Sequence, residues 1–161
     1  MNDKLGKEAE EKIKQWLDRK DDGYAFYRLY DIMTGFYGQY NISDFICYKY
    51  PYQWFIESKS TWEDRFDINM ISETQYEGLM KMSDIPGVHA VVIVLFASYQ
   101  RAFIIDIREI DRYRSETGKK SFNIKKIDHW SFKYSEIQTI PNSRKKLLDY
   151  TGELEDHIKN L

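Results

Sequence analysis

The chain has 161 residues and a formal net charge of −2, and it is 42% hydrophobic and 31% charged. These values are typical of one soluble globular domain, residues 1–161, and exclude a chain that binds nucleic acid through its overall charge. The single cysteine, Cys47, excludes a disulfide framework and a thiolate metal cluster. No secretion leader and no apolar run of membrane-spanning length are visible, so we expect a cytoplasmic protein without a membrane partner.

The first part of the chain predicts a helix followed by three strands. A helix is expected over residues 4–19, because Ala9, Ile13 and Trp16 recur at helical spacing and form one apolar stripe. The strands are expected at 24–30, 42–49 and 53–59, and the last two fold back on each other around Tyr50-Pro51-Tyr52.

The next part predicts a helix, two strands and a further helix. Ser72-Glu73-Thr74-Gln75 has the form of a capping box and therefore starts a helix. Residues 88–96 are almost continuous Val, Ile and Leu, as in a strand buried on both faces. The expected elements are a helix at about 72–82, strands at 88–96 and 102–107, and a helix that starts at Asp106 and ends near Gly118.

This order, α-β-β-β-α-β-β-α, indicates an α/β fold with a mixed central sheet flanked by helices. We interpret residues 4–118 as the core and residues 119–161 as a basic C-terminal extension. In that extension, four apolar residues are expected to pack loops onto the core: Phe122, Trp130, Phe132 and Ile140.

The hairpin brings two carboxylates and one ammonium group together. Side chains alternate between the faces of a strand, so Glu57 and Lys59 share a face. A turn centred on Pro51 gives paired residue numbers that sum to about 102, which sets Asp44 opposite Ser58. Cross-strand neighbours lie roughly 5 Å apart and diagonal neighbours roughly 7–8 Å apart, so one metal ion could contact both carboxylates.

These residue types suit the hydrolysis of a phosphodiester, which needs the phosphate charge offset and a water deprotonated. Mg²⁺ binds carboxylate and carbonyl oxygens, so we assign Asp44, Glu57 and the Ser58 backbone carbonyl as its ligands. Lys59 is expected to contact the attacking water or the phosphate. The alternative is a surface ion pair between Glu57 and Lys59, but the apolar residues around them favour a functional site.

Two helical residues are placed to reach the same site. Glu10 lies at the edge of the apolar stripe of the first helix, and Gln75 opens the second helix. The alternatives are a charge on the flank of a helix and a simple capping role. Trp62 and Tyr99 are candidates for stacking on bases, although packing is the more common role of such residues.

Basic residues gather late in the chain, where a local patch counts for more than the net charge because phosphate contacts supply most non-specific DNA affinity. Residues 119–146 contain eight basic and two acidic residues. We expect DNA contacts from Lys119, Lys120, Lys125, Lys126, Arg144, Lys145 and Lys146. The alternative is a solvated face that balances acidic helices.

Taken together, Gly6-x-x-x-Glu10, Asp44, Glu57-Ser58-Lys59 and Gln75 resemble the PD-(D/E)xK nuclease superfamily, whose restriction-endonuclease-like core is α-β-β-β-α-β. The stretches 42–51 and 55–60 are similar to the RecU-type Holliday junction resolvases, especially the short forms of phages and prophages. The likeness extends from about Gly6 to Gly118.

The resemblance implies cutting of branched DNA by a homodimer that depends on Mg²⁺ or Mn²⁺, with a recombinase as a further partner. It implies that Asp44, Glu57 and Lys59 form the catalytic core, with Glu10 and Gln75 beside them. Tyr27-Arg28-Leu29 resembles the first strand of the family, which implies a phosphate contact for Arg28.

Two departures from the family bear on the substrate. Cellular members carry a longer insertion before the Asp, whereas only 13 residues separate Tyr30 from Asp44 here. Ser43 stands where the superfamily motif has Pro. Two alternatives therefore accompany junction resolution: a structure-selective or restriction-like nuclease of the same fold, and a DNA-binding accessory protein whose carboxylates are structural.

Overall fold

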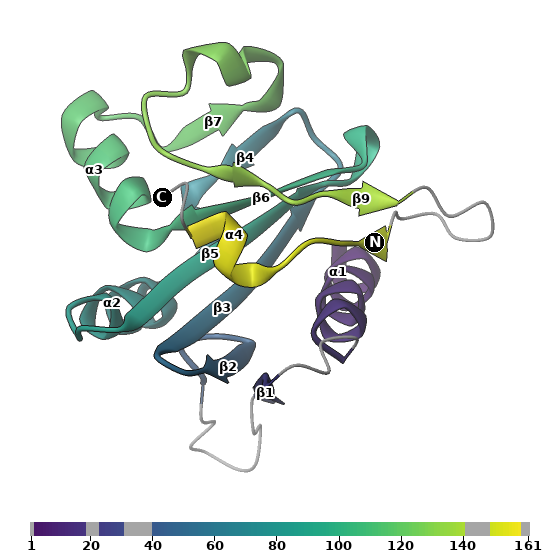
Figure 1. Ribbon diagram of the computed structural model, residues 1–161. Coiled ribbons are helices and arrows are strands. Elements are labelled where there is room, and N and C mark those ends of the chain that lie inside the picture. Colours follow the sequence, from purple (N-terminus) through teal and green to yellow (C-terminus); the bar gives the residue numbers. More distant parts are fainter. Residues whose placement is uncertain (1, 19–22, 31–39, 141–148, 159–161) are drawn as a thin grey trace, which may run out of the picture.

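The computed structural model describes residues 2–18, 23–30, 40–140 and 149–158 (Figure 1). A six-stranded sheet with the strand order β1-β2-β3-β5-β6-β8 forms its centre. Strands β3 and β5 run parallel, and the other neighbours in this sheet are antiparallel. The predicted mixed sheet and its α-β-β-β-α-β order are thus confirmed, with the short strand β4 as an addition before the second helix.

The helices and strands of this part of the chain are, in order, α1 (Asn2–Asp18), β1 (Ala25–Arg28), β2 (Phe45–Lys49), β3 (Tyr52–Thr61), β4 (Arg65–Asp67), η1 (Ile68–Met70), α2 (Glu73–Ser83), β5 (Val88–Phe96), η2 (Ala97–Tyr99), β6 (Arg101–Asp106) and α3 (Ile107–Thr117). The elements that follow are β7 (Ser121–Asn123), η3 (Ile124–His129), β8 (Ser135–Glu136), β9 (Thr139–Ile140), β10 (Asp149–Tyr150) and α4 (Leu154–Ile158). None of the helices in the described residues is long and apolar enough to cross a membrane.

The core has two layers, one on each face of the sheet. Helix α1 covers one face together with the C-terminal segment, because Ile13 and Trp16 share a buried cluster with Tyr150 and Leu154. Helices α2 and α3 cover the other face (Figure 1). Strand β5 lies between the two layers. Successive residues of this strand are buried in opposite layers, as the run of Val, Ile and Leu predicted.

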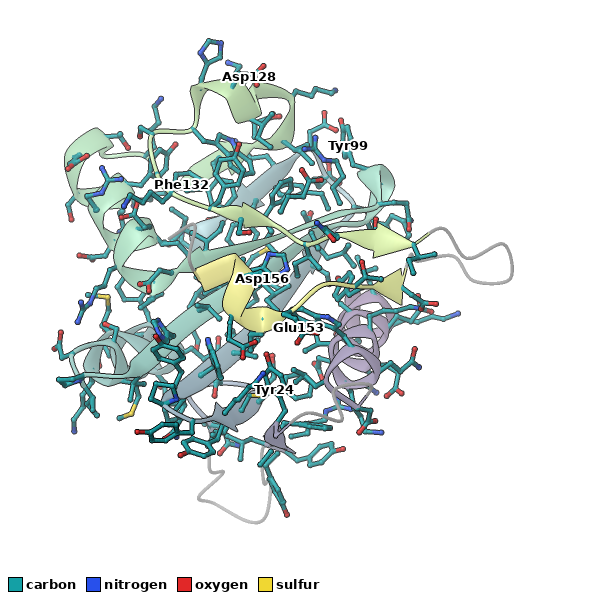
Figure 2. The ribbon with its side chains drawn as sticks, viewed as in Figure 1. Tyr24, Tyr99, Asp128, Phe132, Glu153 and Asp156 are labelled. Carbon is teal, nitrogen blue, oxygen red and sulfur yellow. The ribbon has the colours of Figure 1, made fainter. Side chains whose placement is uncertain are left out.

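The C-terminal segment is tied across the hairpin end of the sheet. Lys49 in β2 forms an ion pair of 2.8 Å with Glu155, and the Tyr24 hydroxyl donates to Glu153 at 3.4 Å. Figure 2 shows Tyr24 directly below Glu153. The chain after Gly118 therefore adds β8 to the central sheet and α4 to a core layer, which the sequence patterns did not predict.

Three of the four apolar residues expected to pack after Gly118 do so. Phe122 and Phe132 are buried, and Trp130 packs against the same cluster. Ile140 is 55% exposed, so its predicted burial was wrong. It lies in the two-stranded ribbon of β9 and β10, outside the central sheet.

The hairpin forms as predicted, but its register differs by one residue. Phe45 pairs with Ile56 and Lys49 with Tyr52, so paired numbers sum to 101 rather than 102 and the turn consists of two residues. Asp44 lies just outside this ladder, and its backbone N–H donates to the Ile56 carbonyl at 3.0 Å. Asp44 and Phe45 thus both face Ile56, as in a β-bulge. Bulges redirect side chains beside functional sites.

Helix α2 begins as its sequence predicts. The Ser72 side chain accepts from the backbone N–H of Gln75, and the Gln75 side chain accepts from the backbone N–H of Ser72, which completes the capping box. Helix α3 begins at an Asp106 cap that binds the N–H of Arg108, and it ends at Gly118, whose φ of 67° suits glycine.

Candidate active site

The site lies where β2 has ended and β3 continues. Strand β2 begins at Phe45, so no strand among the described residues lies beside β3 on that side beyond Ile56. The Asp44 side chain occupies this edge, where its Oδ2 accepts the backbone N–H of Ser58 at 2.7 Å. The N–H and C=O of a strand residue face the same edge, so the Ser58 carbonyl also faces the site.

Three side chains form a bonded group next to Asp44. Lys59 Nζ lies 2.7 Å from Glu57 Oε1 and donates to Gln75 Oε1 at 3.1 Å. Gln75 Nε2 donates to the same Glu57 Oε1 at 2.7 Å. The predicted alternation of β3 is the cause, because it directs Glu57 and Lys59 to the face that α2 covers. Gln75 thus serves both the helix cap and the site.

Glu10 reaches the site from the other face of the sheet. It is held by an ion pair with Arg28, which β1 provides. The guanidinium of Arg28 also lies 4.8 Å from the ring centre of Tyr30 and 6.0 Å from that of Phe45. Arg28 is 18% exposed at its side chain, and its Nε is buried without a hydrogen-bond partner among the described residues.

One cavity of about 380 Å³ joins these groups. All six residues predicted for the site line it: Glu10, Asp44, Glu57, Ser58, Lys59 and Gln75. The sequence interpretation missed other lining residues, including Asp3 and Lys7 of α1 and Met70 of η1. Helical spacing offered a signal for the first two, since Lys7 precedes Glu10 by three residues and Asp3 precedes Lys7 by four.

Both carboxyl groups hold protons unusually tightly. Burial, followed by the charge of Asp44, raises the pKa of Glu57 to about 8, although the Lys59 ammonium acts in the opposite direction. Burial is also the main cause that raises the pKa of Asp44 to about 6, against the hydrogen bond from Ser58. Glu57 is 1% exposed, so its negative charge lacks the stabilisation that water would give.

These residues fit a divalent cation. Glu57 Oε2 is buried and has no hydrogen-bond partner among the described residues. A cation there would give this oxygen a partner and offset the repulsion between the two carboxylates. The described residues contain no group of three or more His, Cys, Asp and Glu side chains placed to hold a metal. The carbonyl of Ser58, which the sequence predicted as a further ligand, faces the site.

Comparison with known proteins identifies the family. The sequence matches RecU, recombination protein U, over residues 18–155. The chain belongs to the RecU family. Membership confirms the resemblance to RecU-type Holliday junction resolvases and makes the chain a nuclease of DNA recombination.

Similar solved structures include Hjc, a Holliday junction resolvase from Archaeoglobus fulgidus. It has a TM-score of 0.47 and 16% sequence identity, over 65% of this chain and 78% of that chain. A comparison with curated proteins found no match.

The basic residues predicted to bind DNA in this RecU member divide into two groups. Lys119 and Lys120 precede β7, and Lys125 and Lys126 follow it; all four are exposed. Lys125 forms an ion pair of 2.5 Å with Asp64. The other predicted contacts lie outside the described residues: Arg144, Lys145 and Lys146.

Proposed function

We propose that this protein is a metal-dependent endodeoxyribonuclease that resolves four-way DNA junctions as a homodimer during recombination. Membership of the RecU family supports the substrate and the pathway. The observation that carries the chemistry is the convergence of Asp44, Glu57 and Lys59 in one cavity, where an oxygen of Glu57 has no hydrogen-bond partner in the described part of the chain. DNA as the substrate agrees with the cytoplasmic location expected from the sequence.

Three oxygen donors would hold Mg²⁺ or Mn²⁺ in this proposal: the carboxylates of Asp44 and Glu57 and the backbone carbonyl of Ser58. When bound, the ion offsets phosphate charge and lowers the pKa of water, which supplies a nucleophile near neutral pH. The raised pKa values of the two carboxyl groups support this assignment, because they arise from burial and from repulsion between neighbouring negative charges, which a bound cation would offset.

Lys59 is proposed to act on the reacting groups directly. Its ammonium is fixed by Glu57 and Gln75, so it needs little reorganisation to donate to the attacking water or to a phosphate oxygen. In the reaction, the water oxygen forms a bond to phosphorus, one ester P–O bond breaks, and the leaving oxygen takes up a proton. Gln75 positions the ammonium and the carboxylate of Glu57 at once.

Glu10 is proposed to complete the charge balance of the site. Its carboxylate raises the pKa of both Asp44 and Glu57, so it acts close enough to favour a bound cation. Arg28, predicted to contact phosphate, holds Glu10 in an ion pair. A phosphate contact of Arg28 would therefore compete with that pair.

The experiment that tests the function is a cleavage panel with Lys59→Ala. The wild type with Mg²⁺ or Mn²⁺ is offered a four-way junction, a flap and a linear duplex. We expect paired symmetrical nicks in the junction from the wild type, and no cutting by Lys59→Ala, which still binds the junction. Lys81→Ala removes an exposed lysine from the far end of α2 and serves as the matched control, with activity unchanged.

The panel also separates the alternatives. Preferential cutting of flaps or duplex would favour a structure-selective or restriction-like nuclease, which the short segment before Asp44 makes a specific alternative. A wild type that binds junctions but cuts no DNA with either metal would favour the accessory protein. Light scattering of the free protein measures the proposed dimer, and a pull-down with a recombinase tests the further partner.

A further inference from the structure

A second hollow continues from the active-site cavity. It has a volume of about 720 Å³ and follows the chain from the end of β3 through β4. Ser60 and Met70 line both this hollow and the active-site cavity, so the two spaces adjoin. Lys59 and Trp62 are three residues apart, roughly 10 Å of extended chain, which corresponds to about three base steps of DNA.

The residue that distinguishes this groove is Trp62. Its side chain lines the groove and is 39% exposed. The other three tryptophans are packed: Trp16 and Trp54 are buried, and Trp130 lies within a cluster of aromatic rings. Among the described residues, Trp62 is the tryptophan without an aromatic neighbour. An indole with a free face beside a nuclease site is suited to stack on a base.

The groove is lined by charges of both signs: Arg65 is basic, and Glu63, Asp64 and Asp67 are acidic, so its base contact would come from Trp62 and its backbone contact from Arg65. Arg65 lines it, is exposed, and forms no ion pair among the described residues. Asp64 does not cancel this charge, because its carboxylate already accepts from Lys125 and, at 2.5 Å, from Tyr99. Tyr99, labelled in Figure 2, packs against the core and donates its hydroxyl to Asp64, so it is not the residue proposed to stack on a base.

The wall of the groove carries more of the predicted DNA contacts. Strand β7 pairs with β4, and Asn123 of β7 lines the groove. Lys119 and Lys120 come directly before β7, and Lys125 and Lys126 follow it after the buried Ile124, so exposed lysines lie on both sides of this strand.

We propose that this groove is a subsite for unpaired nucleotides of the strand being cut, with Trp62 stacked on a base and Arg65 facing the backbone. The inference rests on the proposed nuclease function and names the local state of its substrate. Bases inside a duplex already stack on both faces, so Trp62 can engage only a base that has left the stack. Strands at a branch point supply such bases.

A binding experiment without metal tests the subsite independently of cleavage. Wild type, Trp62→Ala and Trp62→Phe are titrated in EDTA with a 12-nucleotide oligothymidylate and with an abasic oligonucleotide of equal length and charge. We expect the wild type to prefer the thymidylate about tenfold, Trp62→Ala to lose this preference, and Trp62→Phe to keep part of it. Tyr50→Ala, an exposed aromatic at the hairpin turn, should behave as wild type.

Intrinsic tryptophan fluorescence gives a second readout on the unaltered protein. The thymidylate should quench the wild type and leave Trp62→Phe unquenched. Equal affinity of the wild type for the two oligonucleotides, or quenching that survives in Trp62→Phe, would overturn the subsite. If the wild type cuts junctions but shows no preference for bases, only the subsite proposal is refuted. If it prefers bases but cuts no DNA, only the nuclease proposal is refuted.

Discussion

Replacing Glu57 by Gln should stabilise the metal-free protein at high pH while abolishing cleavage. Gln has the shape of the protonated carboxyl group and can still accept from Lys59 and Gln75. It does not ionise, so it avoids placing a charge at a position that is 1% exposed. The wild type and Glu57→Gln should therefore differ in a way that depends on pH.

The sign and size of this difference in stability follow from the pKa of Glu57, which is raised from 4.5 to about 8. Below pH 4.5 the group is protonated in both the folded and the unfolded chain, and its contribution to stability is fully present. Between pH 4.5 and about pH 8 only the folded state keeps the proton, so the free energy of unfolding falls by about 1.4 kcal/mol per pH unit. From pH 5 to pH 8 the upper limit is about 4 kcal/mol, and we expect about 2–4 kcal/mol.

Urea unfolding in EDTA at pH 5, 6.5 and 8 measures this difference. The free energy of unfolding of Glu57→Gln minus that of the wild type should grow with pH. Mg²⁺ at about a hundred times its dissociation constant should add about 2.7 kcal/mol to the wild type alone. Glu77→Gln, an exposed glutamate on α2, controls for the change in net charge. A difference that is constant from pH 5 to pH 8 would refute the reasoning.

Two further predictions concern the metal and the packing behind it. Isothermal titration should show Mg²⁺ affinity rising as pH increases from 6 to 8, by up to tenfold per unit, because Glu57 must release its proton; a flat profile would contradict the ligand assignment. Gly78→Ala should lower stability by about 1–3 kcal/mol in thermal unfolding and reduce cleavage, because a Cβ there would come within 2.2 Å of the Ile42 side chain, two residues before Asp44. Ile42→Ala should restore part of the stability of Gly78→Ala, and an absence of rescue would contradict this contact.

The parts of the site that sequence predicted are those set by local rules. Alternation along β3 puts Glu57 and Lys59 on one face, and the capping-box pattern places Gln75 at a helix start. Helical spacing likewise placed Glu10 at the edge of an apolar stripe. These rules need only a few neighbouring residues, so they hold without knowledge of the rest of the chain.

What sequence did not predict depends on contacts between distant residues. The hairpin turn has two residues rather than three, and the position of Asp44 outside the ladder depends on packing at the end of β2. The pairing of β4 with β7 joins segments more than fifty residues apart through strands of three residues, too short for a recognisable alternation. The partner of Arg28 also comes from another element, α1.

The partly buried ion pair between Lys12 and Asp149, at 2.6 Å, joins positions 137 apart along the chain. Helix α1 thus gains this partner only after Asp149 has been synthesised. Until then, the face of the sheet beneath α1 lacks part of its cover. Completion of that layer depends on contacts between distant parts of the chain, which form slowly in folding.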